Sequence, residues 1–105
     1  MKVVVLDEAL AEAREAALWY DERAPGVGVD FLSEYHTILE AIEQDPERYP
    51  FAEMTDIRFG VRSARMSRFP YALNYETRAD HVRVLAVSHA ARRPNYWIRR
   101  RADSR

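Results

Sequence analysis

The hydrophobic positions of the first half of the chain show strand spacing once and helical spacing twice. Residues 2–6 form a short β-branched run, which predicts an edge strand. Alanine and aromatic residues then recur at helical spacing over residues 8–23, and larger apolar residues do so over residues 29–44. Proline and glycine in residues 24–26 separate the two segments. The pattern therefore predicts a strand followed by an antiparallel helical hairpin.

The second half of the chain changes to strand spacing. Residues 57–66 are compatible with a strand, and their arginines and Gly60 predict a bulged or edge-like strand with a cationic face. In residues 71–75 the large side chains of Tyr71, Leu73 and Tyr75 occupy alternate positions, which places them on one face of a strand. Residues 82–87 are nearly all apolar, which predicts an inner strand covered on both faces.

A basic and aromatic segment follows the predicted inner strand. Pro94 can stand in the first turn of a short helix, which leaves Trp97 and Ile98 to pack and residues 99–101 to extend into solvent. The expected fold class is α+β, with an N-terminal strand and a helical hairpin packed on a small antiparallel β-sheet and a short C-terminal helix or tail. A length of 105 residues suits a single domain, residues 1–105.

The net charge of -1 conceals a division between the two halves of the chain. Residues 1–56 carry 4 basic and 14 acidic side chains, whereas residues 57–105 carry 12 basic and 3 acidic ones. The 12 basic residues are all arginines, whose guanidinium groups suit bidentate or stacked recognition of phosphate or carboxylate. Two interpretations stay open: an external anionic partner, or neutralisation within the chain between acidic helices and a basic sheet.

The composition also excludes several classes of site. The chain has no cysteine, so disulfides, thiolate metal ligands and a cysteine nucleophile are excluded. The three histidines do not share a metal-binding spacing, and no glycine-rich nucleotide loop is present, so we expect no metal and no cofactor. No apolar run approaches the roughly 18 residues of a membrane span, and the N-terminal run is too short for a secretory signal. We therefore expect no membrane partner and a cytoplasmic location.

Cations, donors and rings gather in the segment that follows the inner strand, which makes it the candidate site. The residues expected to contact a target are Arg62, Arg65, Arg68, His89, Arg92, Arg93, Tyr96, Trp97 and Arg99. Each also has a structural alternative. A histidine at a strand end is often a hydrogen-bonded structural residue, and buried aromatic residues such as Trp97 dominate small cores.

Six short motifs occur in order along nearly the whole chain. They are W-Y at residues 19–20, P-G-x-G-x-x-F at 25–31, D-P-x-R-Y-P at 45–50, R-F-P-Y-x-L-x-Y at 68–75, V-L-A-V-x-H at 84–89 and R-R-P-x-Y-W at 92–97. In this order and spacing they resemble the RelE/ParE toxin superfamily. The resemblance implies a bacterial toxin of a type II toxin-antitoxin (plasmid stabilisation) module. It also implies a cognate antitoxin that neutralises the toxin in a hetero-oligomer.

The resemblance implies one of two activities. Ribosome-dependent members of the superfamily cleave messenger RNA with cationic and acid/base side chains, and an arginine commonly follows the aromatic residue early in the penultimate strand. Here Ala72 follows Tyr71, so that phosphate clamp is missing, and Arg65, His89 and Arg92 remain as a reduced nuclease set. The R-F-P-Y and R-R-P-x-Y-W motifs resemble the ParE branch more closely, whose members poison DNA gyrase by binding.

Three hypotheses therefore stay open. The favoured one is a ParE-like toxin that binds DNA gyrase and has no covalent chemistry of its own. The second is an mRNA endoribonuclease of the RelE kind, with the ribosome and mRNA as partners. The third is a non-toxic protein that survives as a partner of its antitoxin or in operon repression. In each case we expect antitoxin carboxylates to meet the arginines.

Overall fold

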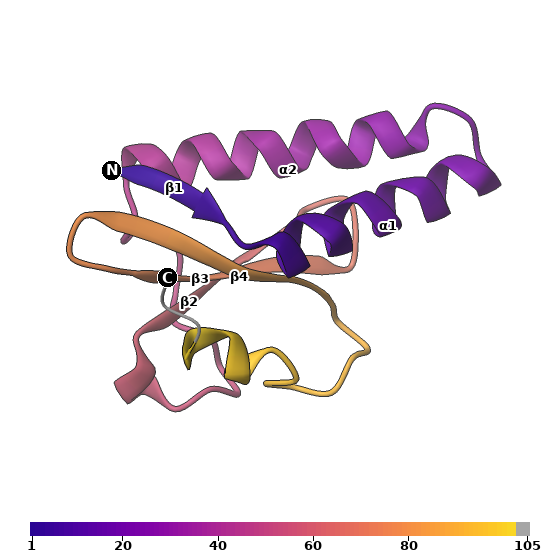
Figure 1. Ribbon diagram of the computed structural model, residues 1–105. Helices are drawn as coiled ribbons and strands as arrows, with labels where there is room; N and C mark the ends of the chain where they lie inside the picture. The colour runs from indigo at the N-terminus through magenta and orange to yellow at the C-terminus, as the bar shows by residue number, and fades with distance from the viewer. Residues whose placement is uncertain (103–105) are drawn as a thin grey trace.

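The computed structural model describes residues 1–102, which form a layer of two helices over one face of a four-stranded sheet (Figure 1). The elements in chain order are β1 (Lys2–Val5), α1 (Asp7–Arg23), α2 (Val27–Gln44), the 3₁₀ helix η1 (Ile57–Phe59), β2 (Val61–Arg65), β3 (Tyr71–Thr77), β4 (His81–His89) and the 3₁₀ helix η2 (Ile98–Ala102). This arrangement confirms the α+β fold expected from the spacing of apolar residues.

The sheet has the strand order β1-β4-β3-β2. β4 is an inner strand and β1 is an edge strand, as predicted, and residues 82–87 are buried throughout. β1 runs parallel to β4, whereas the other pairs are antiparallel, so the sheet is mixed rather than purely antiparallel. The pairing of β3 with β4 shifts at Asn74 and Tyr75, which pair with Ala86 and Val84. Leu85 is therefore an extra residue in β4, as in a β-bulge.

The two helices approach each other closely at Gly28 of α2 and Ala17 of α1. α1 buries four alanines, Ala9, Ala13, Ala16 and Ala17. α2 begins two residues earlier than expected, at Val27, and this extension includes Gly28. A Cβ atom built on Gly28 would lie 2.5 Å from the carbonyl oxygen of Ala17. Neither helix has an apolar stretch that could span a membrane.

The prediction of a continuous strand over residues 57–66 is wrong for its first part. Residues 57–59 form η1, and Asp56 caps it by accepting a hydrogen bond from the backbone N–H of Arg58 at 2.9 Å. Gly60 has a left-handed φ of 68° and ends η1, so it is not a bulge within a strand. β2 begins only after this glycine.

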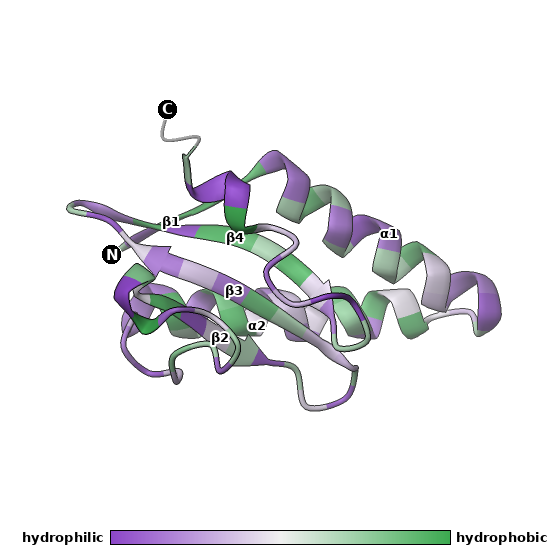
Figure 2. Cartoon of the chain, turned by 90° about the horizontal axis from the view of Figure 1, so that it is seen from below, coloured by the Kyte–Doolittle hydropathy of each residue, from purple (hydrophilic) through white to green (hydrophobic). Residues whose placement is uncertain are grey.

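The C-terminal segment covers the face of the sheet that points away from the helices. Trp97 is only 3% exposed and packs with Val61 and Leu85 in a second apolar cluster. Figure 2 views this side, with the hydrophobic part of β4 beneath the hydrophilic η2. The expectation that residues 99–101 extend into solvent is wrong for Arg100 and Arg101, because both form ion pairs with the body of the protein.

Candidate functional site

Carboxylates within the chain pair with most arginines of the second half. Of the eleven arginines in residues 57–102, eight form ion pairs, namely Arg58, Arg65, Arg68, Arg78, Arg83, Arg92, Arg100 and Arg101. The twelfth, Arg105, lies outside the described residues. This pairing supports neutralisation within the chain, the second of the two interpretations of the charge division.

One group of ion pairs surrounds Glu76, whose side chain is only 5% exposed. Its carboxylate oxygens lie 3.0 Å from Arg78, 3.6 Å from Arg83 and 3.1 Å from Arg101. Arg83 also donates a hydrogen bond to the carbonyl oxygen of Arg100 at 2.9 Å. These contacts hold η2 against β3 and β4.

A second group surrounds Glu12 on α1. One carboxylate oxygen accepts hydrogen bonds from the backbone N–H of Val87 at 3.0 Å and from Arg100 at 2.9 Å. The other oxygen accepts from the hydroxyl of Tyr96 at 2.6 Å. Arg100 in turn donates to the carbonyl oxygen of Leu85 at 3.0 Å. Glu12 and Arg100 thus satisfy backbone groups of β4 beyond the point where β1 ends.

A cleft opens beside this group, between α1, the adjoining ends of β3 and β4 and the segment after β4. It has a volume of about 460 Å³, and we call it the α1–β4 cleft. Its lining residues are Glu12, Glu15, Ala16, Trp19, Tyr20, Tyr71, Val87, His89, Arg92 and Tyr96. Glu12, Glu15, Ala16 and Trp19 share a spacing of i, i+3, i+4 and i+7, which places them on one face of α1.

Aromatic rings form much of the wall of the α1–β4 cleft. Tyr71 pairs with His89 across β3 and β4, and their rings meet edge to face with centroids 5.0 Å apart. Tyr20 contacts the ring of Trp19 at 5.0 Å and that of Tyr71 at 6.3 Å. Trp19 is 49% exposed, so the wall ends in a large ring that is open to solvent.

The surroundings of the cleft raise the pKa of two of its tyrosines, Tyr71 and Tyr96. Burial raises the pKa of Tyr71, and the nearby carboxylates of Glu12 and Glu15 raise this pKa further. Burial and the hydrogen bond to Glu12 raise the pKa of Tyr96. Nδ1 of His89 accepts a hydrogen bond from the backbone N–H of Ala91 at 2.9 Å, which places the proton of the neutral ring on Nε2. Because their pKa is raised, the hydroxyls of Tyr71 and Tyr96 stay protonated near neutral pH and are suited to donating hydrogen bonds, not to acting as a base.

The structure does not bring the reduced nuclease set together. His89 and Arg92 line the α1–β4 cleft, on the side of the sheet that faces α1. In the sheet, Arg65 lies opposite Ala72, and Ala72 lies opposite Ser88. His89 follows Ser88 in β4 and lies opposite Tyr71. Successive side chains of a strand point to opposite faces of a sheet. Arg65 therefore points away from the side on which His89 lies.

The candidate contact residues at the C-terminal end divide between the cleft and the core. His89, Arg92 and Tyr96 line the cleft, and Arg93 is exposed beside it. Arg92 stacks on the ring of Tyr96 at 3.6 Å, and its guanidinium lies 3.9 Å from Glu12. Trp97 is buried, so the structural alternative holds for this residue.

The remaining candidates lie apart from the cleft. Arg62 donates to the carbonyl oxygen of Tyr49 at 2.8 Å, in the loop before β2. Arg68 lies 3.3 Å from Asp30 of α2. Arg65 pairs with Glu53 at 2.8 Å, and Arg99 is exposed on η2. The candidates therefore occupy several separate places and do not form one cationic surface.

Sequence reasoning missed the roles of Glu12 and Glu15. Both belong to the acidic first half and fall largely outside the apolar positions of the helix predicted over residues 8–23, and the signal that could have singled them out is their spacing with Ala16 and Trp19 on one helical face. The partners of Glu12 could not have been found in this way, because Arg100 is 88 residues distant in the sequence.

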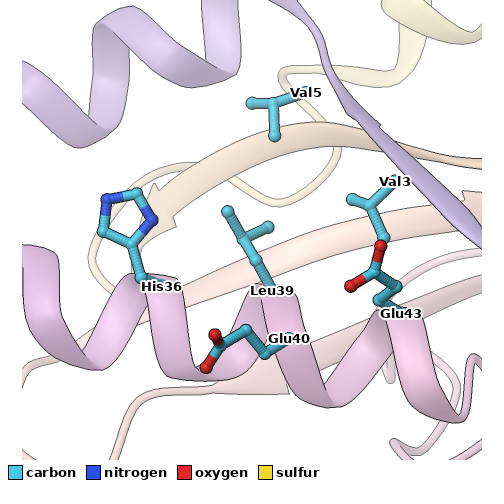
Figure 3. Close-up of a pocket in the computed structure, with 6 residues that line it drawn as sticks. All are labelled: Val3, Val5, His36, Leu39, Glu40 and Glu43. Carbon is cyan, nitrogen blue, oxygen red and sulfur yellow. The ribbon is translucent and has the colours of Figure 1, made fainter.

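A second hollow, of about 340 Å³, lies between β1 and α2 (Figure 3). Its lining residues are Val3, Val5, His36, Leu39, Glu40 and Glu43. None of the candidate contact residues lies there. Within residues 1–102, no group of three or more acidic or histidine side chains is arranged to hold a metal ion.

Comparison with known proteins gives a likeness of structure. No protein-family model and no curated protein matches the chain. Among solved structures, a chain of the chromosomal ParDE TA system from P. aeruginosa is similar, with a TM-score of 0.71 and 14% sequence identity. The match covers 85% of this chain and 95% of that one. The chain thus has the fold that its motifs led us to expect.

Proposed function

We propose that the protein is the toxin of a type II toxin-antitoxin module, that a cognate antitoxin neutralises it, and that it acts by binding an essential target. The observation that carries this proposal is the likeness to a chain of a ParDE TA system over 95% of that chain. The six sequence motifs also resemble this class of toxin, and this resemblance does not depend on the structure.

The arrangement of charged side chains favours binding over RNA cleavage. Cleavage by attack of the 2′-hydroxyl requires a proton acceptor and a phosphate-binding cation at one place. Arg65 lies on the face of the sheet opposite His89, and Arg92 is stacked on Tyr96 beside Glu12. We therefore propose DNA gyrase as the target, in line with the ParE-like motifs.

Expression in a bacterial host tests the toxin proposal. We expect induction to arrest growth, and co-expression of a small protein encoded by the neighbouring reading frame to restore it. Harmless expression at a high level of folded protein would refute the proposal and leave the non-toxic interaction protein.

The target can be tested in the same cells. A gyrase-binding toxin should produce gyrase-dependent DNA breaks and leave cellular messages intact. Primer extension on those messages provides the opposing readout, because codon-phased cuts would instead establish a ribosome-dependent endoribonuclease.

Two arginine variants show which face of the sheet contacts the target. We expect Arg92→Ala to weaken toxicity by about tenfold, since the loss of a well-placed interface arginine commonly costs more than about 1 kcal/mol. Arg65→Ala is the matched variant on the opposite face. A loss confined to Arg65→Ala would move the contact surface to that face. Full toxicity of both variants at unchanged protein level would remove these arginines from the mechanism.

A further inference from the structure

The α1–β4 cleft contains one carboxylate that forms no ion pair with any other residue of the described part of the chain, residues 1–102. Glu12 forms an ion pair with Arg100 at 2.9 Å, and Arg92 also approaches Glu12. Glu15 lies one turn further along α1 and is exposed, and it forms no ion pair within residues 1–102. Arg92 and Arg100 are thus both directed to Glu12. Glu15 remains available to a cation from outside.

The rings that line the cleft together with Glu15 provide a second feature that attracts cations. A guanidinium or ammonium group over the face of a tryptophan or tyrosine is attracted by the negative face of the ring. The chain itself makes this contact on two rings that line the cleft, those of Trp19 and Tyr96. Arg23 lies 3.6 Å from the ring centroid of Trp19, and Arg92 lies 3.6 Å from that of Tyr96. Tyr20 and Tyr71 provide further ring surface in the cleft.

The surroundings of the cleft suit a polypeptide partner. Leu18 and Trp19 are 61% and 49% exposed, so the rim beside the cleft carries apolar side chains that a partner chain can cover. The volume of about 460 Å³ is large enough for one long side chain but is open to solvent on one side. The carboxylates of Glu12 and Glu15 both act on Tyr71, because each adds to the rise that burial causes in the pKa of its hydroxyl.

We propose that the α1–β4 cleft receives an arginine side chain of a partner protein, with its guanidinium between the carboxylate of Glu15 and the rings of Trp19 and Tyr71. Arginine fits better than lysine because its planar group stacks on rings and is more weakly hydrated. The proposal differs from the expectation that partner carboxylates meet the arginines of this chain, since eight of the eleven arginines in residues 57–102 form ion pairs within the chain. Identifying the partner with an antitoxin rests on the proposed function, whereas the preference of the cleft for a guanidinium group does not.

The test uses the full-length ¹⁵N-labelled protein and a blocked pentapeptide, acetyl-Ala-Ala-Arg-Ala-Ala-amide. Chemical shifts of the Trp19 indole N–H and of the Glu15 backbone report on the cleft. We expect saturable shifts at millimolar peptide, as befits a single side-chain contact. The citrulline peptide has the same shape without the charge and should bind at least about fivefold more weakly.

Variants then locate the contact. Glu15→Gln should weaken binding of the arginine peptide by roughly threefold to tenfold, because it removes the carboxylate and keeps the size of the side chain. Glu40→Gln is the matched control, an exposed carboxylate on α2 in the hollow of Figure 3, and should leave binding unchanged. Well-dispersed spectra of both variants show that the fold is retained.

Several results would overturn the proposal. Equal binding of the arginine and citrulline peptides would exclude charge recognition, and equal binding of a lysine peptide would exclude stacking of the guanidinium. Unchanged affinity of Glu15→Gln for the arginine peptide would exclude a role of Glu15 in binding. Stronger binding of a glutamate peptide than of the arginine peptide would exclude it as well. None of these results depends on toxicity in cells, so they can be separated from a failure of the proposed function.

Discussion

Gly28 has no space for a side chain, because α1 lies directly against it. A Cβ atom at this position would lie 2.5 Å from the carbonyl oxygen of Ala17 and 2.9 Å from the Cβ of Asp21. The neighbouring backbone is fixed as well, since the N–H of Gly28 donates to the carboxylate of Asp21 at 3.2 Å. The glycine in the P-G-x-G-x-x-F motif therefore has a packing role.

Replacing this glycine should separate the two helices. We expect Gly28→Ala to lower the free energy of unfolding by about 1–3 kcal/mol, because the added methyl group meets backbone atoms that cannot rotate away. Urea denaturation measures the loss. Ser33→Ala, at an exposed position of the same helix, is the control and should change this free energy by less than about 0.5 kcal/mol. A similar loss in both variants would contradict the packing explanation.

Tyr75 should make the stability of the protein depend on alkaline pH. Burial raises the pKa of its hydroxyl to about 12, and the hydroxyl donates to the carbonyl oxygen of Pro46 at 2.7 Å. Between the unfolded pKa of about 10 and this value, the folded chain holds a proton that the unfolded chain has lost, so stability falls as pH rises. Tyr75→Phe should show a shallower fall in the free energy of unfolding across this range. Parallel curves for the two proteins would contradict the assignment.

Among the elements, η2 is held in place mainly by charged side chains. Arg100 joins it to Glu12 of α1, and Arg101 joins it to Glu76 of β3. Asn95 fixes the approach to η2, because its side chain donates to the carbonyl oxygen of Met54 at 2.8 Å and accepts from Thr55 at 2.7 Å. Contacts with residues far away in the sequence thus position η2, a 3₁₀ helix of only 5 residues.

Removing the charge of Glu12 should loosen the C-terminal segment before the rest of the protein. We expect Glu12→Gln to lower the free energy of unfolding by about 2–3 kcal/mol, because it leaves the partly buried Arg100 without its counterion. Hydrogen exchange should rise first in residues 96–102. Glu15→Gln, one turn away and exposed, is the control. An increase of exchange spread evenly over the sheet would contradict this account.

The type of each long element could be predicted from the sequence, because the order of apolar and polar residues reflects which faces are buried: one face of each helix and both faces of β4. The strand predicted over residues 57–66 failed for a local reason. Asp56 caps a turn of 3₁₀ helix, and Gly60 ends it in a left-handed conformation. Ile57 is 67% exposed, so its apolar character gives no information on a buried face. The spacing of apolar residues therefore cannot predict a short helical turn that is stabilised by a capping side chain and not by burial.

For the whole molecule, the charge division reflects how the chain folds on itself. The sequence showed an acidic half and a basic half, but it could not show that Glu12 meets Arg100, since the pairing depends on tertiary structure. The same limit applies to the candidate site. His89 and Arg92 could be identified from their segment, and they do meet in the cleft, whereas Arg65 belongs to a different face.

The two groups of ion pairs should act together in the stability of the whole chain. Glu12→Gln and Arg101→Gln each weaken the attachment of η2. After one substitution has released η2, the other substitution removes a smaller stabilising contribution. The double variant should therefore be less destabilised than the sum of the single variants, by about 0.5–3 kcal/mol. Urea denaturation of the four proteins measures this coupling. Simple additivity would show that the two groups act independently.

The opposite surroundings of the two tryptophans give the protein a built-in pair of optical probes. Trp97 is 3% exposed beneath the C-terminal segment, and Trp19 is 49% exposed at the rim of the cleft. A water-soluble quencher such as acrylamide should therefore extinguish the emission of Trp19 and spare that of Trp97. The long-wavelength emission of Trp19 would report whether the cleft is occupied. The quench-resistant, short-wavelength emission of Trp97 would report whether the C-terminal segment still covers the opposite side of the sheet.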